Sequence, residues 1–542
     1  MNSNGASNAD SESLDKRSLF KIWESLAEDN PEGRFINVAP QHEPRVLKYN
    51  FAAFQKRAVR HAVAIQKVLK LEPGDKIAVC VDDLSDFALL VHGAFLAHCV
   101  IIPIPRSATT EELKLILKAT KPKLFVFPSS FSASVSELFP IAPYVKRWIV
   151  TGKGVEGGGA SAIGPGKAIQ RLEQVVLSIA GEEFDIPQVD EKVPCGAVFS
   201  PSGRFRSASS SVFFTREQIL MKAQLAARVL SSSTKSGSFW TSASEFSPSG
   251  FLFNFFVPLF LGTPALIRPG FDERDFWRQL LADDVRLAVI NVHQLERLER
   301  KGKQRDWRKP DDFKVLVSDQ ARLDETVLSG FIERFRTPVG VGFFSFALAE
   351  YVSVRSPQEE DLKLMRGEGD EALPTYGRLL GEATVAPSQL KGLKTKSRYN
   401  WGDLQVKSVL GGPTVKTGIR AALVEEPEGL ELYVVGRTKN LVVRKSRLIN
   451  LARIDTLVAQ MQGVVYAKCV SYPHDEYGHD FLLYVLPHRL AQMNKYDVEL
   501  YLAEFFERED LPSTIILEES GGVAPPKSES ELRARVGKPE KS

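Results

Sequence analysis

The chain has 542 residues, 43% of them hydrophobic and 25% charged, and its 70 basic and 67 acidic residues give a net charge of +3. This length exceeds what one compact core normally holds, so we expect two or more structural units. The near balance of charge gives no electrostatic reason to expect nucleic acid or an anionic membrane as the main partner.

The N-terminal residues 1–17 are polar and lack the apolar segment of a secretory signal, so we expect a disordered tail. Only four cysteines occur, and none has metal-ligand spacing to another: Cys80, Cys99, Cys195 and Cys469. So few cysteines in so long a chain predict buried, reduced thiols and favour a cytoplasmic location.

Short apolar strands alternate with helices through the first 340 residues. The helices are expected at 47–69, 83–97, 108–119 and 323–336, and the strands at LEPGDKIAVCV, CVIIPIP, KPKLFVFP and DDFKVLVSDQ. This alternation is typical of parallel βαβ units, so the predicted class is α/β, with parallel-rich sheets flanked by helices.

The most apolar run is GFLFNFFVPLFLGTPALI, residues 250–267. Its length is close to that of a membrane span, which is one interpretation. Two prolines, two glycines and Asn254 interrupt it, and no basic segment precedes it. These features favour a buried helix that leads into a buried strand.

The pattern changes after Gly436. A helix is expected at 448–461, two strands at VVYAKCVSYP and FLLYVLP, and a second helix at 491–507. We therefore predict a large domain over 18–436, a small α+β domain over 437–520 and a flexible tail over 521–542. Residues 153–166 and 357–371 are expected to form loops.

The segment VKTGIRAALVEEPEGLELYVVGRTKNLVVR, Val415 to Arg444, resembles the hinge of the adenylate-forming superfamily, which includes acyl-CoA synthetases, fatty-acyl-AMP ligases and luciferases. That hinge reads RTGD, a strand, then GRxKDxI. FFSFALAEYVSV and LPTYGRLLGEATVAP resemble further motifs of the superfamily, in the same order. The resemblance spans about 450 residues and is closest to fatty-acyl-AMP ligases and to the similar domains of disco-interacting proteins.

The resemblance implies that a carboxylic acid is joined to the α-phosphate of ATP, with Mg²⁺ assisting and pyrophosphate leaving. The phosphate-gripping loop would lie in FSPSGRFRSASSSVFFT, where Ser200, Ser202, Gly203 and Thr215 are the candidate phosphate-binding residues. Hydroxyls and backbone N–H groups suit that task. The alternative is a Ser-rich surface loop between a strand and a helix.

Four further residues are implied as members of the site. Glu350 matches the glutamate that coordinates or orients the metal, and Phe346 takes the place of a tyrosine that stacks on adenine. Thr417 matches the threonine of RTGD. Arg437 matches the arginine that reaches the ribose and α-phosphate. The alternatives are a solvated Glu350 and a Phe346 that belongs to the core.

Several residues depart from the superfamily pattern. Ile419 replaces the aspartate that accepts the ribose hydroxyls, and Asn440 replaces the hinge aspartate. Losing one such bond costs about 1–3 kcal/mol unless another residue, such as Asp403, substitutes. The terminal catalytic lysine is missing: Glu531 stands near its position, and Lys527 or Lys538 would have to reach inward.

Ser446 replaces a glycine of the CoA tunnel, which favours acyl-AMP formation over thioester formation with CoA. His293, His474 and His479 belong to no recognisable triad or ligand cluster.

Two hypotheses follow. In the first, the chain is an ATP-dependent fatty-acyl-AMP ligase with a degenerate nucleotide site. Its substrate would be a fatty or polyketide-like acid held in the apolar region around 251–260, and an acyl-carrier domain could be its partner. Alternatively, it is a catalytically impaired acyl-binding or scaffold module of the same fold.

Overall fold

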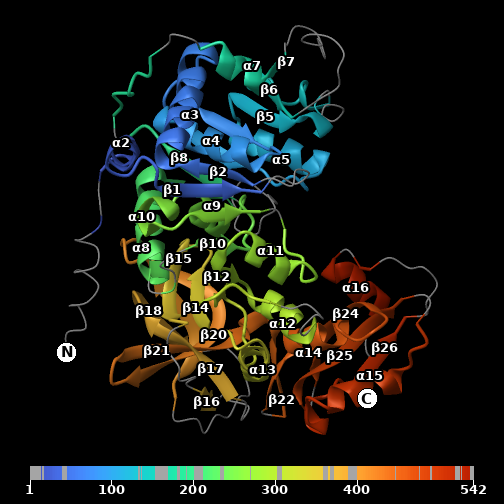
Figure 1. Ribbon diagram of the computed structural model, residues 1–542. Helices are drawn as coiled ribbons and strands as arrows, with labels where there is room; N and C mark the ends of the chain where they lie inside the picture. The colour runs from blue at the N-terminus through green and yellow to red at the C-terminus, as the bar shows by residue number, and fades with distance from the viewer. Residues whose placement is uncertain are drawn as a thin grey trace.

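The computed structural model describes residues 14, 17–39, 46–131, 135, 137–152, 169–179, 183–190, 192–199, 211–231, 233, 237–268, 270–301, 308–357, 364–366, 372–387, 399–445, 447–474, 477–488, 491–518, 525–526 and 528–536. Within these residues the strands form three sheets (Figure 1). Two large sheets stack above each other, and the third lies beside the lower one.

The upper sheet in Figure 1 is mostly parallel, with strand order β7-β6-β5-β3-β4-β8-β9. Among its described strand pairs, β8–β9 alone is antiparallel. Its strands are β3 (Lys76–Val79), β4 (Val100–Pro103), β5 (Leu124–Pro128), β6 (Arg147–Thr151), β7 (Ile169–Arg171), β8 (Gly196–Phe199) and β9 (Val212–Thr215). Its helices are α3 (Phe51–Val63) with a π-helical extension (Ala64–Val68), α4 (Leu84–Leu96), α5 (Thr110–Thr120) and α7 (Leu172–Leu177), and a 3₁₀ turn covers Ser129–Phe131.

The second sheet is mixed, with order β18-β19-β20-β21-β17-β15-β14-β13-β12-β10-β11-β1-β2, and β16 pairs with β17. Its first strands are β1 (Arg34–Val38), β2 (Leu47–Asn50), β10 (Ser238–Thr241), β11 (Ala265–Ile267), β12 (Val285–Ile290), β13 (Lys314–Asp319) and β14 (Val339–Ser345). The remaining strands are β15 (Glu350–Arg355), β16 (Leu364–Arg366), β17 (Ala372–Leu379), β18 (Glu382–Pro387), β19 (Trp401–Lys407), β20 (Val415–Glu426) and β21 (Gly429–Arg437).

Seven helices accompany this second sheet in the described chain: α2 (Leu19–Asp29), α8 (Arg216–Ser231), α9 (Pro248–Phe255), α10 (Pro258–Leu261), α11 (Phe276–Ala282), α12 (Val292–Lys301) and α13 (Glu325–Phe335). The main hydrophobic core joins the two large sheets, because Val79 of β3, Phe87 of α4, Phe251 of α9 and Val289 of β12 belong to one buried cluster.

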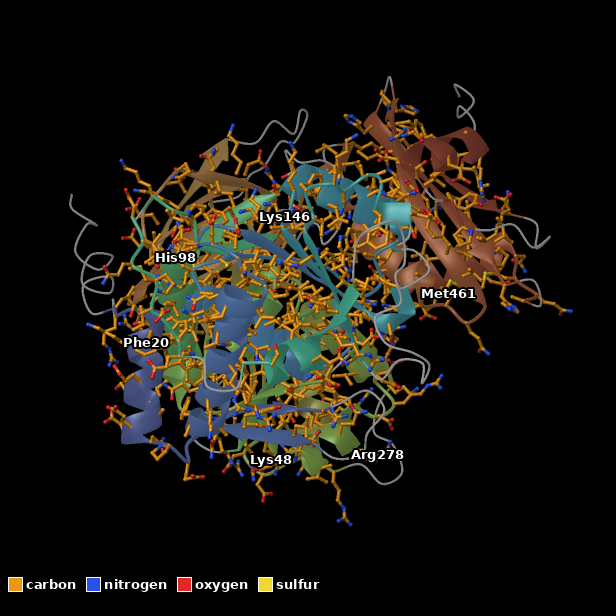
Figure 2. All side chains as sticks on the ribbon, turned by 90° about the horizontal axis from the view of Figure 1, so that it is seen from above. Phe20, Lys48, His98, Lys146, Arg278 and Met461 are labelled. Atoms are coloured by element: carbon orange, nitrogen blue, oxygen red, sulfur yellow. The ribbon has the colours of Figure 1, made fainter. Side chains whose placement is uncertain are left out.

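The third sheet follows a 3₁₀ turn at Thr438–Asn440 and has the order β23-β22-β25-β24, with β26 beside β25. Its elements are β22 (Leu441–Arg444), β23 (Arg447–Asn450), α14 (Leu451–Ala459), β24 (Val464–His474), β25 (Gly478–Pro487), α15 (Lys495–Ala503), a 3₁₀ turn (Arg508–Asp510), β26 (Thr514–Leu517) and α16 (Glu529–Val536). Figure 2 shows this unit, on which Met461 is labelled, at one side of the molecule.

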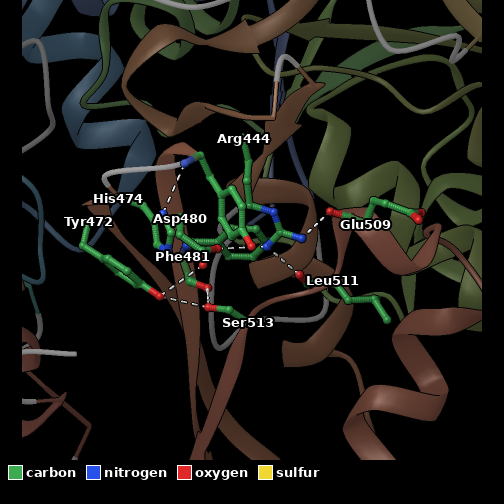
Figure 3. A network of polar contacts seen from close by, with 9 residues as sticks. Arg444, Tyr472, His474, Asp480, Phe481, Glu509, Leu511 and Ser513 are labelled. Atoms are coloured by element: carbon green, nitrogen blue, oxygen red, sulfur yellow. Dashed lines mark hydrogen bonds and ion pairs between the residues drawn. The ribbon is translucent and has the colours of Figure 1, made fainter. Parts of the chain in front are cut away.

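A buried arginine ties the third sheet together (Figure 3). The Arg444 guanidinium on β22 donates to Asp480 Oδ1 on β25 at 3.0 Å and to the Leu511 carbonyl at 2.9 Å. It also donates to the Glu509 carbonyl and lies 5.2 Å from the centre of the Phe481 ring. One side chain therefore joins two strands and the segment before β26.

The predicted α/β class is confirmed, and most predicted elements lie where the alternation placed them. Local signals explain the boundaries: Asp83 caps α4 through the Ser85 N–H at 2.7 Å, and Thr109 with Glu112 forms a capping box on α5.

Two predicted helix starts are wrong, and one predicted loop contains a strand. Residues 47–50 form strand β2, and the helix begins only at Phe51, because the Asn50 side chain accepts the Ala53 N–H at 2.8 Å and caps it.

The helix predicted at 448–461 begins at Leu451, because residues 447–450 form strand β23, and the loop predicted at 357–371 contains β16. The loop predicted at 153–166 lies outside the described residues. In the tail, residues 529–536 form α16, whose Leu532 is buried against β24 and β25.

The apolar run at 250–267 is buried as predicted, with α9, α10 and β11 in sequence. No helix in the described part of the chain is long and apolar enough to cross a membrane. All four cysteines are free and buried, and burial raises the pKa of the Cys80 and Cys195 thiols to about 12. Such thiols are unreactive, as the sequence predicts.

Candidate functional site

Glu350 is the first residue of β15 and is 5% exposed. Its carboxylate receives three donors from two other elements. Lys222 of α8 and the Ser408 hydroxyl both donate to Oε1, and the Val409 N–H donates to Oε2 at 3.3 Å. Glu350 therefore joins α8 to the loop between β19 and β20.

Lys222 lies on the buried face of α8, with a side chain that is 5% exposed. Burial lowers its pKa, and the negative charge of Glu350 acts in the opposite direction. Its ammonium also lies 5.5 Å from the centre of the Phe214 ring. Lys222 was not among the sequence candidates, because a single lysine in a helix normally faces solvent.

A cavity of about 380 Å³ lies beside this ion pair, between α8 and strands β15, β17 and β21. Its polar lining includes Lys222, Glu350, Arg378 and Glu431. Its apolar lining comes mainly from Leu225, Ala226, Val229, Leu316, Val354 and Leu380. The buried hydroxyl of Ser233 also lines the cavity and has no hydrogen-bond partner among the residues that the structure describes. The space thus combines apolar walls with charged and polar groups, which is typical of small-molecule sites.

Phe346 and Thr417 lie on different parts of the second sheet. Phe346, in the turn between β14 and β15, is half-buried, and its ring centre is 6.0 Å from that of Phe344. The Thr417 hydroxyl on β20 donates to the Leu404 carbonyl at 2.8 Å and accepts the Ile419 N–H at 3.1 Å. Both contacts hold the backbone of β19 and β20.

Arg437 ends β21 and is exposed, and its strand partner on β20 is Ile419. The Ile419 side chain is fully buried in a core cluster. Asp403 of β19 lies at the same place, since its Oδ1 accepts the Thr438 hydroxyl at 2.8 Å, directly after Arg437. The structure thus brings a carboxylate from a different strand to the hinge.

Thr215 ends β9 and caps α8, because its hydroxyl accepts the Gln218 N–H at 3.1 Å while Gln218 Oε1 accepts the Thr215 N–H at 3.0 Å. Ser200, Ser202 and Gly203 lie outside the described residues, as do Ser446, Lys527 and Lys538. Glu531 is on α16 and pairs with Arg535 at 2.7 Å.

The described residues contain no group of three His, Cys, Asp or Glu side chains that could hold a metal ion. A Mg²⁺ ion at Glu350, which the fold family implies, would compete with an ammonium and a hydroxyl on Oε1 and with an N–H on Oε2. Hard cations need free carboxylate oxygens.

Comparison with known proteins gives three kinds of match. Residues 27–157 match the family model of the AMP-binding enzymes. The oxalate–CoA ligase of Arabidopsis thaliana is 20% identical over 528 residues, which cover 93% of this chain and 95% of that protein.

Among solved structures, the anthranilate CoA ligase AuaEII in complex with anthranoyl-AMP superimposes with a TM-score of 0.70 at 11% identity, covering 94% of this chain and 95% of that one. The O-succinylbenzoate CoA synthetase of Bacillus subtilis, in complex with ATP and a magnesium ion, gives a TM-score of 0.66 at 15% identity, covering 92% and 95%. These findings confirm the resemblance to the adenylate-forming superfamily and its fold. The closer resemblance to fatty-acyl-AMP ligases and to disco-interacting proteins stays a prediction.

Proposed function

We propose that this chain, which has the fold of the adenylate-forming superfamily, joins a carboxylic acid to ATP. A carboxylate oxygen of the acid attacks the α-phosphorus, the bond between that phosphorus and the bridging oxygen breaks, and pyrophosphate leaves. The products are an acyl-adenylate and pyrophosphate. No proton has to be taken from the acid, because it reacts as a carboxylate, so the chain's task is to position both substrates.

The observation that carries this proposal is the cavity beside Glu350 and Lys222. Its volume of about 380 Å³ falls in the range of small-ligand pockets, and Leu225, Ala226, Val229 and Val354 give it apolar walls beside the charged groups. These features support an acid with an apolar body, of the fatty or aryl type. The region around 251–260, where the sequence predicted the acyl group, is filled by packed phenylalanines such as Phe251 and Phe255.

Arg437 and Phe346 are the proposed nucleotide contacts. Arg437 is exposed at the end of β21, so its guanidinium is free to form charge-assisted bonds to a phosphate. Phe346 keeps part of its ring accessible for stacking on adenine. Asp403, beside Thr438, is the proposed acceptor for the ribose hydroxyls in place of the buried Ile419.

We also propose that the chain divides between residues 436 and 437 and turns at Asn440. This proposal is supported by the three-residue turn at Thr438–Asn440, which connects β21 to the third sheet. Arg453 of α14 pairs with Asp324 at 3.0 Å and holds the small unit against α13 in this arrangement. Rotation of the small unit would break this pair.

The second hypothesis, a non-catalytic binding module, is not favoured by the comparisons, since the similar proteins are named as ligases. Their names also make CoA the first acceptor to test for the acyl group, with a carrier-protein phosphopantetheine as the second.

The proposal is tested by incubating the full chain with ATP, Mg²⁺ and a panel of fatty and aryl acids, and detecting acyl-AMP by mass spectrometry with and without CoA. We expect acyl-AMP with at least one acid, and much less of it with Arg437→Ala. The matched control is Arg533→Ala, an exposed arginine on α16. No acyl-AMP from any acid would contradict the proposal.

A further inference from the structure

Lys222 and Glu350 form an ion pair that is almost completely removed from water, with side chains 5% and 4% exposed. A buried charge is strongly unfavourable unless a partner compensates it. Here each residue compensates the charge of the other. Removing either one would leave the other charge unpaired in apolar surroundings.

Both oxygens of the Glu350 carboxylate already accept donors, two on Oε1 and one on Oε2. Lys222 Nζ and the Ser408 hydroxyl share Oε1, while the Val409 N–H takes Oε2. A divalent cation binds carboxylate oxygens at about 2.0–2.6 Å, and it would have to displace these donors while lying next to the positively charged ammonium.

The groups around the pair make such an exchange unfavourable. Lys222 is bordered by Leu225, Ala226 and the Phe214 ring, so the displaced ammonium would have to stay in apolar surroundings. The other charged groups that line the cavity are Arg228, Arg378 and Glu431, and two of these three are cations. Arg378 also pairs with Glu428, so the charge that a metal ion would meet first at Glu350 is the Lys222 ammonium.

We propose that the Lys222 ammonium takes the place of a divalent cation at Glu350, so that Glu350 is a positioning residue and not a metal ligand. The pair anchors α8 to β15 and to the Ser408–Val409 loop, and any metal that enters with a nucleotide is held without Glu350. The statement about a metal that enters with a nucleotide rests on the proposed function. The statement that Lys222 takes the place of a metal at Glu350 does not.

The test is a Mn²⁺ titration of the full chain, followed by the electron paramagnetic resonance signal of free Mn²⁺, with and without ATP. We expect wild type and Glu350→Gln to bind Mn²⁺ with affinities within twofold of each other in both conditions. A loss of tenfold or more in Glu350→Gln would overturn the proposal.

Lys222→Met provides the complementary measurement, since it keeps the length of the side chain and removes its charge. We expect this variant to gain a Mn²⁺ site that is absent from Lys222→Met/Glu350→Gln. A variant that gains no such site overturns the claim that the ammonium stands in a metal's place. Lys114→Met is the matched control, because Lys114 forms an exposed pair with Glu111 on α5.

Two outcomes keep the inference separate from the proposed function. If wild type binds no ATP under any condition, the proposed function fails, but the ATP-free titrations still decide the occupancy of Glu350. If Lys222→Met does not fold, the double variant, in which both buried charges are removed together, is compared with wild type in the presence of ATP. Equal Mn²⁺ affinity within twofold supports the proposal, and a tenfold loss contradicts it.

Discussion

Replacing Arg444 by Met should destabilise the third sheet selectively. The substitution leaves Asp480, which is 4% exposed, without its cation, and breaking a buried pair in this way costs about 3–5 kcal/mol. The carbonyls of Glu509 and Leu511 lose their donor as well, at about 1–3 kcal/mol each where no water replaces it. Since whole domains are stable by only about 5–15 kcal/mol, most of the stability of this unit is expected to be lost.

Two probes separate this unit from the remainder. Hydrogen exchange of the β24 and β25 amides reports on the unit, whereas the buried tryptophans Trp23, Trp148, Trp240 and Trp277 belong to the cores of the two large sheets. Trp401 packs with Leu441 of β22, so its fluorescence is removed by Trp401→Phe in every variant compared. A loss of about 4 kcal/mol lowers amide protection roughly 10³-fold, at about 1.4 kcal/mol per decade. We expect the urea midpoint from tryptophan fluorescence to stay close to that of wild type.

The matched control is Arg533→Met, whose exposed pair with Glu529 at 3.0 Å should contribute less than about 1 kcal/mol. Two results would contradict a selective stabilising role of Arg444. Protection that falls less than tenfold would mean that the Arg444 network does not stabilise the sheet. A joint loss of protection and of the tryptophan transition would mean that the unit does not unfold separately.

Three further predictions concern the large sheets and the site. Burial, followed by the charges of Asp83 and Glu173, raises the pKa of Asp86 from 3.8 to about 7, so the folded state keeps a proton that the unfolded state releases. Stability is therefore lost as pH rises from about 4 through 7. Asp86→Asn should raise the melting temperature at pH 8 but not at pH 4. An equal change of melting temperature at both pH values would contradict the raised pKa of Asp86. Arg437→Ala should weaken ATP binding about 10- to 100-fold in calorimetry with an unchanged melting temperature; unchanged affinity would remove Arg437 from the site. Val229→Trp, which fills part of the cavity, should raise KM for the largest accepted acid at least tenfold and affect the smallest little; equal effects on both acids would place the substrate elsewhere.

The fold could largely be predicted because its signals are local. Apolar strands such as 124–128 and caps such as Asp83 need no knowledge of distant residues. The start of α3 was predicted too early. The apolar spacing across residues 47–69 looks helical, whereas residues 47–50 form a strand because they pair with β1.

The site was harder to predict, because its contacts join distant segments. Glu350 stood out through its motif, but its partner Lys222 is 128 residues away on α8 and lies in no motif. The weak signal for Lys222 was its position among the apolar residues of α8, where Ile219, Leu220 and Ala223 are also buried. Likewise, the sequence offered Asp403 as a substitute for the aspartate that Ile419 replaces, and the contact of Asp403 with Thr438 places it beside the hinge.

The most direct test of the proposed acid activation is ATP–pyrophosphate exchange with labelled pyrophosphate, measured on the full chain with and without each acid. This exchange requires the reversible formation of an acyl-adenylate and is independent of the final acceptor. The account predicts exchange that depends on the added acid and that falls at least tenfold in Arg437→Ala. An absence of acid-dependent exchange across fatty and aryl acids, with ATP shown to bind, would contradict it.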